Sequence, residues 1–327
     1  MRSMNASLQA EALVASGKIA EAVALLDRAG AAGDGEARFT HAAWLLSGRI
    51  VPRDLARARA LFALAAEAGN VDGARIRAAF AANGTGGDAD WPAACAYLRL
   101  LATSDPAAAR QIEIIDNMAL AADGAPDALP TPQMLRDDPR IILIPGLFTA
   151  AECAYLIQAA EPLIEPSVVI DPRTGHFVRD PVRTSDAAAF PLALENPAIH
   201  ALNRRLAAAT GTEVAQGEPL QVLRYRPGQE YKLHVDALPP QVDNQRVLTA
   251  LVYLNEDFEG GETDFPALGL SVRGKSGDAL IFPNVDDNGR PDQRLRHAGK
   301  PVRNGQKLLA SRWIRARPLD LSGRRQG

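Results

Sequence analysis

The sequence predicts a two-domain α + β protein, in which an all-α helical-repeat solenoid precedes a β-sandwich or jelly roll with flanking helices. Residues 1–125 are rich in Ala, Leu and Arg and have almost no β-branched runs, whereas short apolar and β-branched runs recur at regular spacing in residues 138–320. A chain of 327 residues is long enough for two domains with separate cores. Residues 126–137 are then expected to be a linker, and residues 321–327 a tail.

The first domain shows self-similarity at a period of 36 residues. The segment 29–34 (Ala-Gly-Ala-Ala-Gly-Asp) matches 65–70 (Ala-Ala-Glu-Ala-Gly-Asn), and 54–58 aligns with 90–94 at the same offset. Helix–turn–helix repeats of this length are typical of the tetratricopeptide class, and the Ala-Ala-x-x-Gly endings resemble its Sel1-like subtype. About three helix pairs fit within residues 5–120, near the minimum for a stable stack. An ordinary bundle of Ala-rich helices is the alternative.

The second domain is expected to begin with a strand and a helix. Pro, Gly and Asp are concentrated in residues 121–132, which is typical of a linker. Residues 140–144 (Arg-Ile-Ile-Leu-Ile) then predict a strand, and residues 150–160 predict a helix that packs on it.

A series of short runs predicts the strands of the second domain. The run 246–255 is apolar and β-branched, and most runs are separated from the next by turn residues. The predicted strands are 220–225, 231–236, 246–255, 259–265, 277–282, 297–302, 305–310 and 312–315. Short strands at this spacing favour a sandwich or jelly roll.

The pattern His234-Val-Asp236 predicts two metal ligands on one strand. Side chains at i and i+2 point to the same face of a strand, so the imidazole and the carboxylate can converge on one ion. His297 would complete a set of two imidazoles and one carboxylate, which covers one face of an octahedral metal and is typical of non-haem Fe(II) oxygenases. By itself, His-Val-Asp also occurs as an exposed pair in a strand or loop.

Residues from about 138 to 316 resemble the catalytic domain of prolyl 4-hydroxylases, in the 2-oxoglutarate/Fe(II) dioxygenase superfamily. Several motifs occur in the family's order. They are 144–148 (Ile-Pro-Gly-Leu-Phe), 183–185 (Arg-Thr-Ser), 225–236, 253–255 (Tyr-Leu-Asn), 260–263 (Gly-Gly-Glu-Thr), 277–282 and 297–307. The resemblance implies a double-stranded β-helix, the jelly-roll fold of that superfamily.

The resemblance also implies the iron and cosubstrate ligands. His234, Asp236 and His297 would bind Fe(II), and Lys307 would pair with the distal carboxylate of 2-oxoglutarate. Lys307 stands among apolar residues on a predicted strand, and a cosubstrate carboxylate would account for its burial. A solvent-facing lysine is the alternative.

Six further residues match family positions near the cosubstrate or the substrate. Tyr225, Tyr253 and Thr263 would line the cosubstrate pocket; the two tyrosines could equally be core residues with satisfied hydroxyl groups. Arg183, Tyr231 and Trp313 would lie near the substrate. For Trp313 the alternative is plain core, and for Arg183-Thr-Ser185 it is the cap of a helix over the apolar run 187–194.

The implied activity is hydroxylation of a prolyl residue in a peptide or protein, with decarboxylation of 2-oxoglutarate to succinate. The implied cofactors are Fe(II), 2-oxoglutarate and O2, with ascorbate as an optional addition. One rival retains the chemistry but changes the target to another amino-acid side chain or a free small molecule. Another is a non-catalytic repeat scaffold, which would be expected to lose one of His234, Asp236, His297 or Lys307.

Composition limits the binding partners and the cellular compartment that we expect for the protein. The net charge of −3 gives no basic field for nucleic acid, and no apolar run reaches membrane-spanning length. Cys95 and Cys153 are too few for a disulfide framework, and the first residues lead into an amphipathic helix and not into a signal sequence. We therefore expect a cytoplasmic protein that binds neither nucleic acid nor membrane. Its partner would be a peptide or protein substrate, which the helical repeats could recruit.

Overall fold

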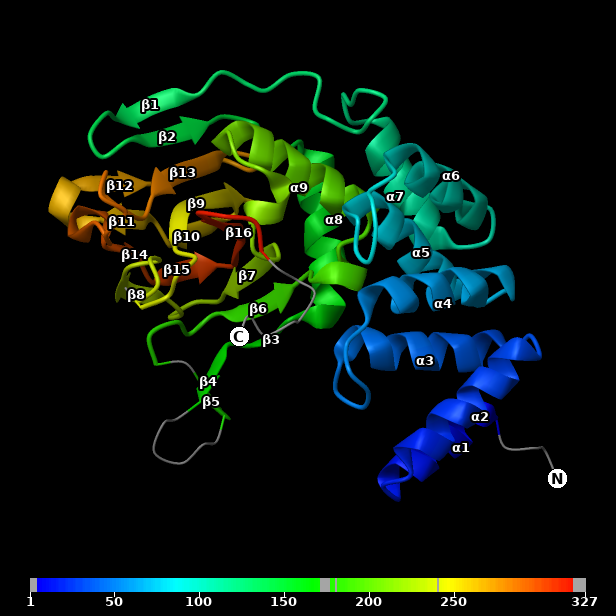
Figure 1. Ribbon diagram of the computed structural model, residues 1–327. Coiled ribbons are helices and arrows are strands. Elements are labelled where there is room, and N and C mark those ends of the chain that lie inside the picture. The colour runs from blue at the N-terminus through cyan, green and yellow to red at the C-terminus, as the bar shows by residue number, and fades with distance from the viewer. Residues whose placement is uncertain (1–4, 171–176, 180, 240, 320–327) are drawn as a thin grey trace. The chain divides into compact units, whose positions relative to one another are not determined.

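The computed structural model describes residues 5–170, 177–179, 181–239 and 241–319 (Figure 1). Within these, the chain forms two compact units. The first comprises residues 5–125 together with 192–201, and the second comprises 126–191 and 202–319. The predicted tail at 321–327 lies outside the described residues.

The first unit is built from helices, each of which packs on the next along the chain. The helices are α1 (Ala6–Ala15), α2 (Ile19–Ala31), α3 (Gly35–Ser47), α4 (Leu55–Glu67), α5 (Val71–Asn83), α6 (Trp91–Ala102) and α7 (Pro106–Asp116). Packing between consecutive helices is the pattern of a stack of helical repeats. The assignment to the Sel1-like class stays a prediction.

The residues that recur every 36 positions are helix caps. Asp34 and Asn70 cap the N-termini of α3 and α5, and Asp54 and Asp90 cap those of α4 and α6, each by accepting a hydrogen bond from a backbone N–H of the first turn. The C-caps Gly48 and Gly84 are left-handed, with φ of 68° and 74°, a conformation that glycine adopts readily. The sequence period therefore relates the pair α3–α4 to the pair α5–α6.

The core of the first unit combines alanine with a few aromatic rings. Phe62 packs edge-on against Phe80 with 5.7 Å between ring centroids, and Ala58 and Ala79 lie in the same cluster with at most 1% exposure. Small side chains let the helices approach closely, while each ring buries a large apolar surface.

The second unit is a jelly roll of two antiparallel sheets. The large sheet has the order β1 (Gln133–Arg136), β2 (Ile141–Ile144), β13 (Ala279–Pro283), β9 (Arg246–Tyr253), β16 (Lys307–Arg315), β7 (Gln221–Tyr225), β6 (Asp186–Ala189) and β3 (Glu165–Pro166). The small sheet has the order β12 (Leu270–Val272), β11 (Thr263–Phe265), β14 (His297–Gly299) and β8 (Tyr231–His234). Two further ladders pair β10 (Phe258–Gly260) with β15 (Val302–Gly305), and β4 (Val168–Ile170) with β5 (Phe177–Arg179).

Helices complete the second unit. Helix α8 (Ala150–Ala160) begins at a capping box formed by Thr149 and Glu152. The part of α9 (Pro197–Thr210) that belongs to this unit meets α8 through Arg205, which donates to Glu152 at 2.7 Å; both side chains are buried. The short 3-10 helices of the chain are η1 (Glu161–Leu163), η2 (Leu192–Leu194), η3 (Val214–Gln216), η4 (Pro266–Leu268) and η5 (Gln293–Leu295).

The core of the jelly roll lies between the two sheets. Leu251 and Phe282 from the large sheet belong to one buried cluster with Phe265 from the small sheet. The rings of Phe265 and Phe282 meet edge-on at 5.1 Å. The predicted jelly roll is confirmed, because alternate side chains of both sheets point inward to a shared core.

Several strand predictions differ from the structure at turns. The predicted strand 259–265 is two strands, β10 and β11, because Gly260 and Gly261 have φ of +73° and +68° and turn the chain. The predicted strands 305–310 and 312–315 are one long strand, β16, and β12 was not predicted. Residues 186–189 form β6, so the alternative of a capped helix after Ser185 is wrong. Part of the expected linker, Gln133–Arg136, forms β1.

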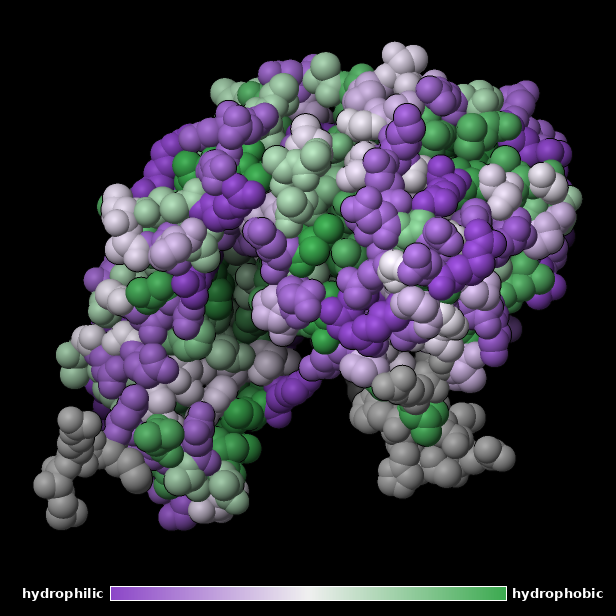
Figure 2. Space-filling view, turned by 180° about the vertical axis from the view of Figure 1, so that it is seen from behind, coloured by the Kyte–Doolittle hydropathy of each residue, from purple (hydrophilic) through white to green (hydrophobic). Residues whose placement is uncertain are grey.

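The described surface carries hydrophilic and hydrophobic side chains in a mixed arrangement on the face shown in Figure 2. Among the described residues, no helix is both long and apolar enough to cross a membrane.

Candidate active site

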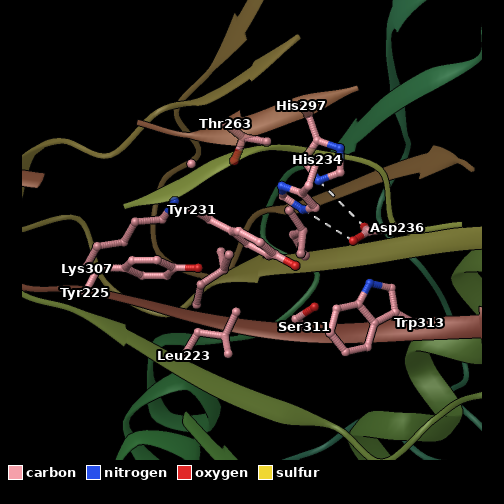
Figure 3. Close-up of a pocket in the computed structure, with 13 residues that line it drawn as sticks. Leu223, Tyr225, Tyr231, His234, Asp236, Thr263, His297, Lys307, Ser311 and Trp313 are labelled. Carbon is pink, nitrogen blue, oxygen red and sulfur yellow. Dashed lines mark ion pairs between the residues drawn. The ribbon is translucent and has the colours of Figure 1, made fainter. Parts of the chain in front are cut away.

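Two neighbouring strands of the small sheet bring the predicted metal ligands together. His234 ends β8 and His297 begins β14, and the two residues are direct partners across the antiparallel pair. Asp236 lies two residues beyond the end of β8, and not on the strand as predicted. One ligand atom from each of the three side chains lies within 4.8 Å of the other two (Figure 3).

Backbone carbonyl groups orient both imidazoles. Nδ1 of His234 lies 2.7 Å from the carbonyl oxygen of Lys232, and Nδ1 of His297 lies 3.0 Å from that of Leu295. A carbonyl oxygen can only accept, so Nδ1 carries the proton in each ring and Nε2 offers a lone pair. The two Nε2 atoms lie 3.4 Å and 3.6 Å from the carboxylate oxygens of Asp236. All three side chains therefore present metal-binding atoms to one point.

The protonation states at neutral pH are also those that bind a cation. Burial lowers the pKa of His297 to about 4. Burial by itself raises the pKa of Asp236, yet His297, His234 and the hydroxyl of Thr249 together hold it well below its usual range. An unprotonated imidazole and a carboxylate are the forms that coordinate metal ions. The donor set fits a divalent first-row transition metal such as Fe(II), with its remaining positions open.

Lys307 is a buried cation beside this cluster. It begins β16 opposite Tyr225 of β7, and its side chain is only 2% exposed. Nζ donates to the carbonyl oxygen of Gly261 at 2.7 Å, and no ion pair joins Lys307 to an acidic group among the described residues. Burial lowers the pKa of Lys307 to about 8, although Glu262 opposes the shift. An amine held in this way favours an anionic ligand, since a carboxylate would supply the missing counter-charge.

The cosubstrate residues predicted beside Lys307 divide into two groups. Tyr225 and Thr263 line the cavity, whereas Tyr253 lies behind it as a fully buried residue. The hydroxyl of Tyr253 is within 3.0 Å of Oγ1 of Thr263 and donates to the carbonyl oxygen of Val272 at 3.3 Å. Tyr253 thus supports the cavity wall as a core residue with a hydrogen-bonded hydroxyl group, which was the alternative given for it.

The three predicted substrate residues take different places. Tyr231 lines the cavity and stacks on His234, with ring centroids 3.4 Å apart and planes 12° apart. Trp313 also lines the cavity, and the guanidinium of Arg246 covers its ring at 3.8 Å. Arg183 does not line the cavity but lies 5.8 Å from the Tyr231 ring, on a segment bridged to that residue.

Sequence reasoning missed the apolar wall of the cavity, and it missed Thr249, whose hydroxyl donates to Oδ2 of Asp236 at 2.7 Å. The wall consists of Leu223 of β7, Leu251 of β9 and Leu309 of β16, with the small Ser311 two residues beyond Leu309 on the same face. Apolar residues on predicted strands were the signal that could have located it. The cavity itself has a volume of about 30 Å³, roughly the room of one water molecule.

Comparisons with known proteins identify relatives of the chain. The family model of the 2OG-Fe(II) oxygenase superfamily matches residues 220–315, where 2OG denotes 2-oxoglutarate. The chain is 36% identical over 203 residues to prolyl 4-hydroxylase 1 of Arabidopsis thaliana, covering 56% of this chain and 71% of that one. It is 33% identical over 189 residues to prolyl 4-hydroxylase subunit alpha-1 of Rattus norvegicus, covering 55% and 35%. The crystal structure of a viral collagen prolyl hydroxylase from Paramecium bursaria Chlorella virus-1, as its 2OG complex, is 30% identical and covers 54% of this chain and 96% of that one, with a TM-score of 0.44.

Proposed function

The chain belongs to the prolyl 4-hydroxylase family of the 2OG-Fe(II) oxygenase superfamily, and we propose that it hydroxylates a prolyl residue of a peptide or protein. The observation that carries the proposal is one cavity that holds two imidazoles, a carboxylate and a buried lysine without an acidic partner among the described residues. The metal ligands suit Fe(II), and the lysine suits the distal carboxylate of 2-oxoglutarate.

The metal and the side chains have separate tasks in this reaction. Fe(II), when bound, supplies the chemistry by which O2 and 2-oxoglutarate yield succinate, CO2 and a hydroxylated carbon. His234, Asp236 and His297 would hold the ion, and Lys307 would orient the cosubstrate through its distal carboxylate. The apolar wall would limit the access of water to the reacting carbon. Because the metal and the cosubstrate supply the chemistry, no general base is needed among these residues.

The aromatic part of the cavity supports a prolyl target. Tyr231 and Trp313 both line the space beside the metal ligands, and a pyrrolidine ring is an apolar, rigid group that packs well on aromatic faces. Arg246 lies over Trp313 and is itself held by Glu218 at 2.6 Å, which keeps the indole in place. The relatives named prolyl 4-hydroxylases give the same indication.

We further propose that the helical repeats recruit the substrate chain. A groove of about 340 Å³ on the first unit is lined by the end of α4, by α5 and by α6. Val71 and Leu100 are 47% and 74% exposed there, and Arg77 covers the ring of Tyr97 at 3.9 Å. An exposed apolar strip with an aromatic side chain fits an extended peptide.

A matched pair of variants tests recruitment. Leu100→Asp should raise KM for a long protein substrate but not for a short peptide, because a short peptide that occupies the catalytic cavity has no further segment to bind the groove. Leu8→Asp, on an exposed residue of α1 outside the groove, is the control. Equal KM values for the long substrate in both variants would remove this proposal.

We also propose a cytoplasmic location. Cys95 and Cys153 are free and buried, as expected for a protein of a reducing compartment. Cell fractionation with an antibody against the protein tests the location.

The hydroxylation itself is tested with purified protein. Under anaerobic conditions, Fe(II) and 2-oxoglutarate should give a visible charge-transfer band, and O2 with a prolyl peptide should give succinate and a product heavier by one oxygen atom. Asp236→Ala should abolish the band and the succinate. A band and succinate without oxygen on any prolyl peptide would shift the target to another side chain or a small molecule, and a wild-type protein with neither would end the enzymatic proposal.

A further inference from the structure

A buried hydroxyl stands behind the carboxylate of the metal cluster. Oγ1 of Thr249 lies 2.7 Å from Oδ2 of Asp236, and the Thr249 side chain is fully buried. Thr249 belongs to β9 of the large sheet, whereas the two histidines lie on the small sheet. The carboxylate is thus held from the sheet opposite to the imidazoles.

The amide of Asn284 gives this contact a direction. Asn284 follows β13, is 4% exposed, and places Nδ2 2.9 Å and Oδ1 3.1 Å from Oγ1 of Thr249. A hydroxyl has one proton, and an ionised carboxylate can only accept. Thr249 therefore donates to Asp236 and accepts from the Nδ2 amide of Asn284, which forms a one-way chain from Asn284 through Thr249 to Asp236.

We infer that Thr249 is a positioning residue for the metal site, and that Asn284 orients its hydroxyl. The inference rests on the proposed Fe(II) site. A hydroxyl on Oδ2 fixes the rotation of the carboxylate and takes up one lone pair of that oxygen, which leaves Oδ1 as the freer metal ligand. With two imidazoles and one carboxylate oxygen, three of six octahedral positions stay open; a carboxylate that bound through both oxygens would close one of them.

Isosteric substitution of Thr249 separates the effect of its hydroxyl group from the effect of its shape. Thr249→Val keeps the shape and removes the donor, whereas Thr249→Ser keeps the donor and loses a methyl group. Thr210→Val, which removes a hydroxyl bonded within α9, is the matched control. The probes are Co(II) and anaerobic Fe(II), each titrated into the full-length apoprotein, with the visible spectrum of the Co(II) form recorded.

The expected result is a loss of metal affinity that follows the hydroxyl. Thr249→Val should bind Co(II) and Fe(II) about 10- to 100-fold more weakly, with a changed Co(II) spectrum, because supporting partners of metal ligands typically contribute this much. Thr249→Ser and the Thr210 control should stay near the wild type. Asn284→Ala, which leaves Thr249 in place, should show a smaller loss in the same direction, and it carries the test if the valine variant does not fold.

Two results would overturn the inference. One is a Thr249→Val protein with wild-type metal affinity and Co(II) spectrum; the other is an equal loss in the Val and Ser variants, which would assign the effect to packing. Failure of the proposed function looks different. The wild type would then still bind Co(II) and Fe(II) more tightly than Thr249→Val does, but the Fe(II) form would show no charge-transfer band on addition of 2-oxoglutarate.

Discussion

Replacing Lys307 by methionine should stabilise the free protein and weaken its cosubstrate binding at the same time. Methionine has a similar length and no charge, so it can fill the same space between Tyr225 and Tyr253. The two effects have opposite signs because the charge is costly in the free fold and is needed only by the ligand.

The cost in the free protein follows from the pKa of Lys307. Burial lowers that pKa from 10.5 to about 8, so below pH 8 the folded protein carries the full penalty of the buried cation, and the penalty disappears as pH rises toward 10.5. A shift of this size corresponds to about 3 kcal/mol at pH 7. Loss of the hydrogen bond to the Gly261 carbonyl lowers the free energy of unfolding by roughly 1–2 kcal/mol and so offsets part of that gain. The net expectation for Lys307→Met is a gain of about 1–2 kcal/mol in the free energy of unfolding.

The cost in the complex follows from the ligand. A carboxylate buried without its cation loses about 3 kcal/mol or more, which corresponds to a Kd raised by at least 100-fold. Denaturant unfolding at pH 7 measures the first effect, and calorimetric titration of 2-oxoglutarate into the metal-loaded protein measures the second. Lys300→Met, on a 45% exposed side chain paired with Asp264, is the control and should change neither by much. If Lys307→Met binds 2-oxoglutarate as tightly as the wild type, the role given to Lys307 is wrong.

Three further outcomes follow from the same contacts. Raising the pH above about 8 should weaken 2-oxoglutarate binding by up to tenfold per pH unit, because Lys307 must then take up a proton to pair with the carboxylate. Calorimetric titrations in buffers of different ionisation enthalpy would show this proton uptake, and an affinity that does not change up to pH 10 would contradict it. His297→Ala should abolish stoichiometric binding of Fe(II) while leaving the fold intact, as metal analysis and circular dichroism would reveal; full retention of the ion would exclude His297 as a ligand. Asp105→Ala, which removes both the cap of α7 and the ion pair with Arg75, should lower the stability of the first unit by about 1–3 kcal/mol without altering metal affinity, and an unchanged unfolding curve would refute that role.

The helical repeats show what local sequence patterns can predict. The 36-residue period was readable because caps are chosen by backbone chemistry within a few residues, and Asp34 and Asn70 do the same work in successive helix pairs. Whether the exposed strip at Val71 and Leu100 is a binding groove depends on how neighbouring helices pack, which no local pattern contains.

The strand boundaries of the jelly roll show where prediction from local sequence fails. The runs of β-branched residues located the strands, yet Gly260 and Gly261 divided one predicted strand into two, and β16 continued through a predicted break. A strand ends where its hydrogen-bonding partner ends, and the partner is remote in sequence.

The sequence by itself determined the chemistry of the site, namely two imidazoles, one carboxylate and a lysine among apolar residues, because residue type and short spacing carry that information. Only the tertiary structure decided which groups stand behind them. It placed Tyr253 in the supporting wall and not in the cavity, left Lys307 facing a carbonyl group, and set Thr249 of the opposite sheet against Asp236. These contacts join residues from different strands, so they follow from the pairing and facing of the sheets and not from any stretch of the chain.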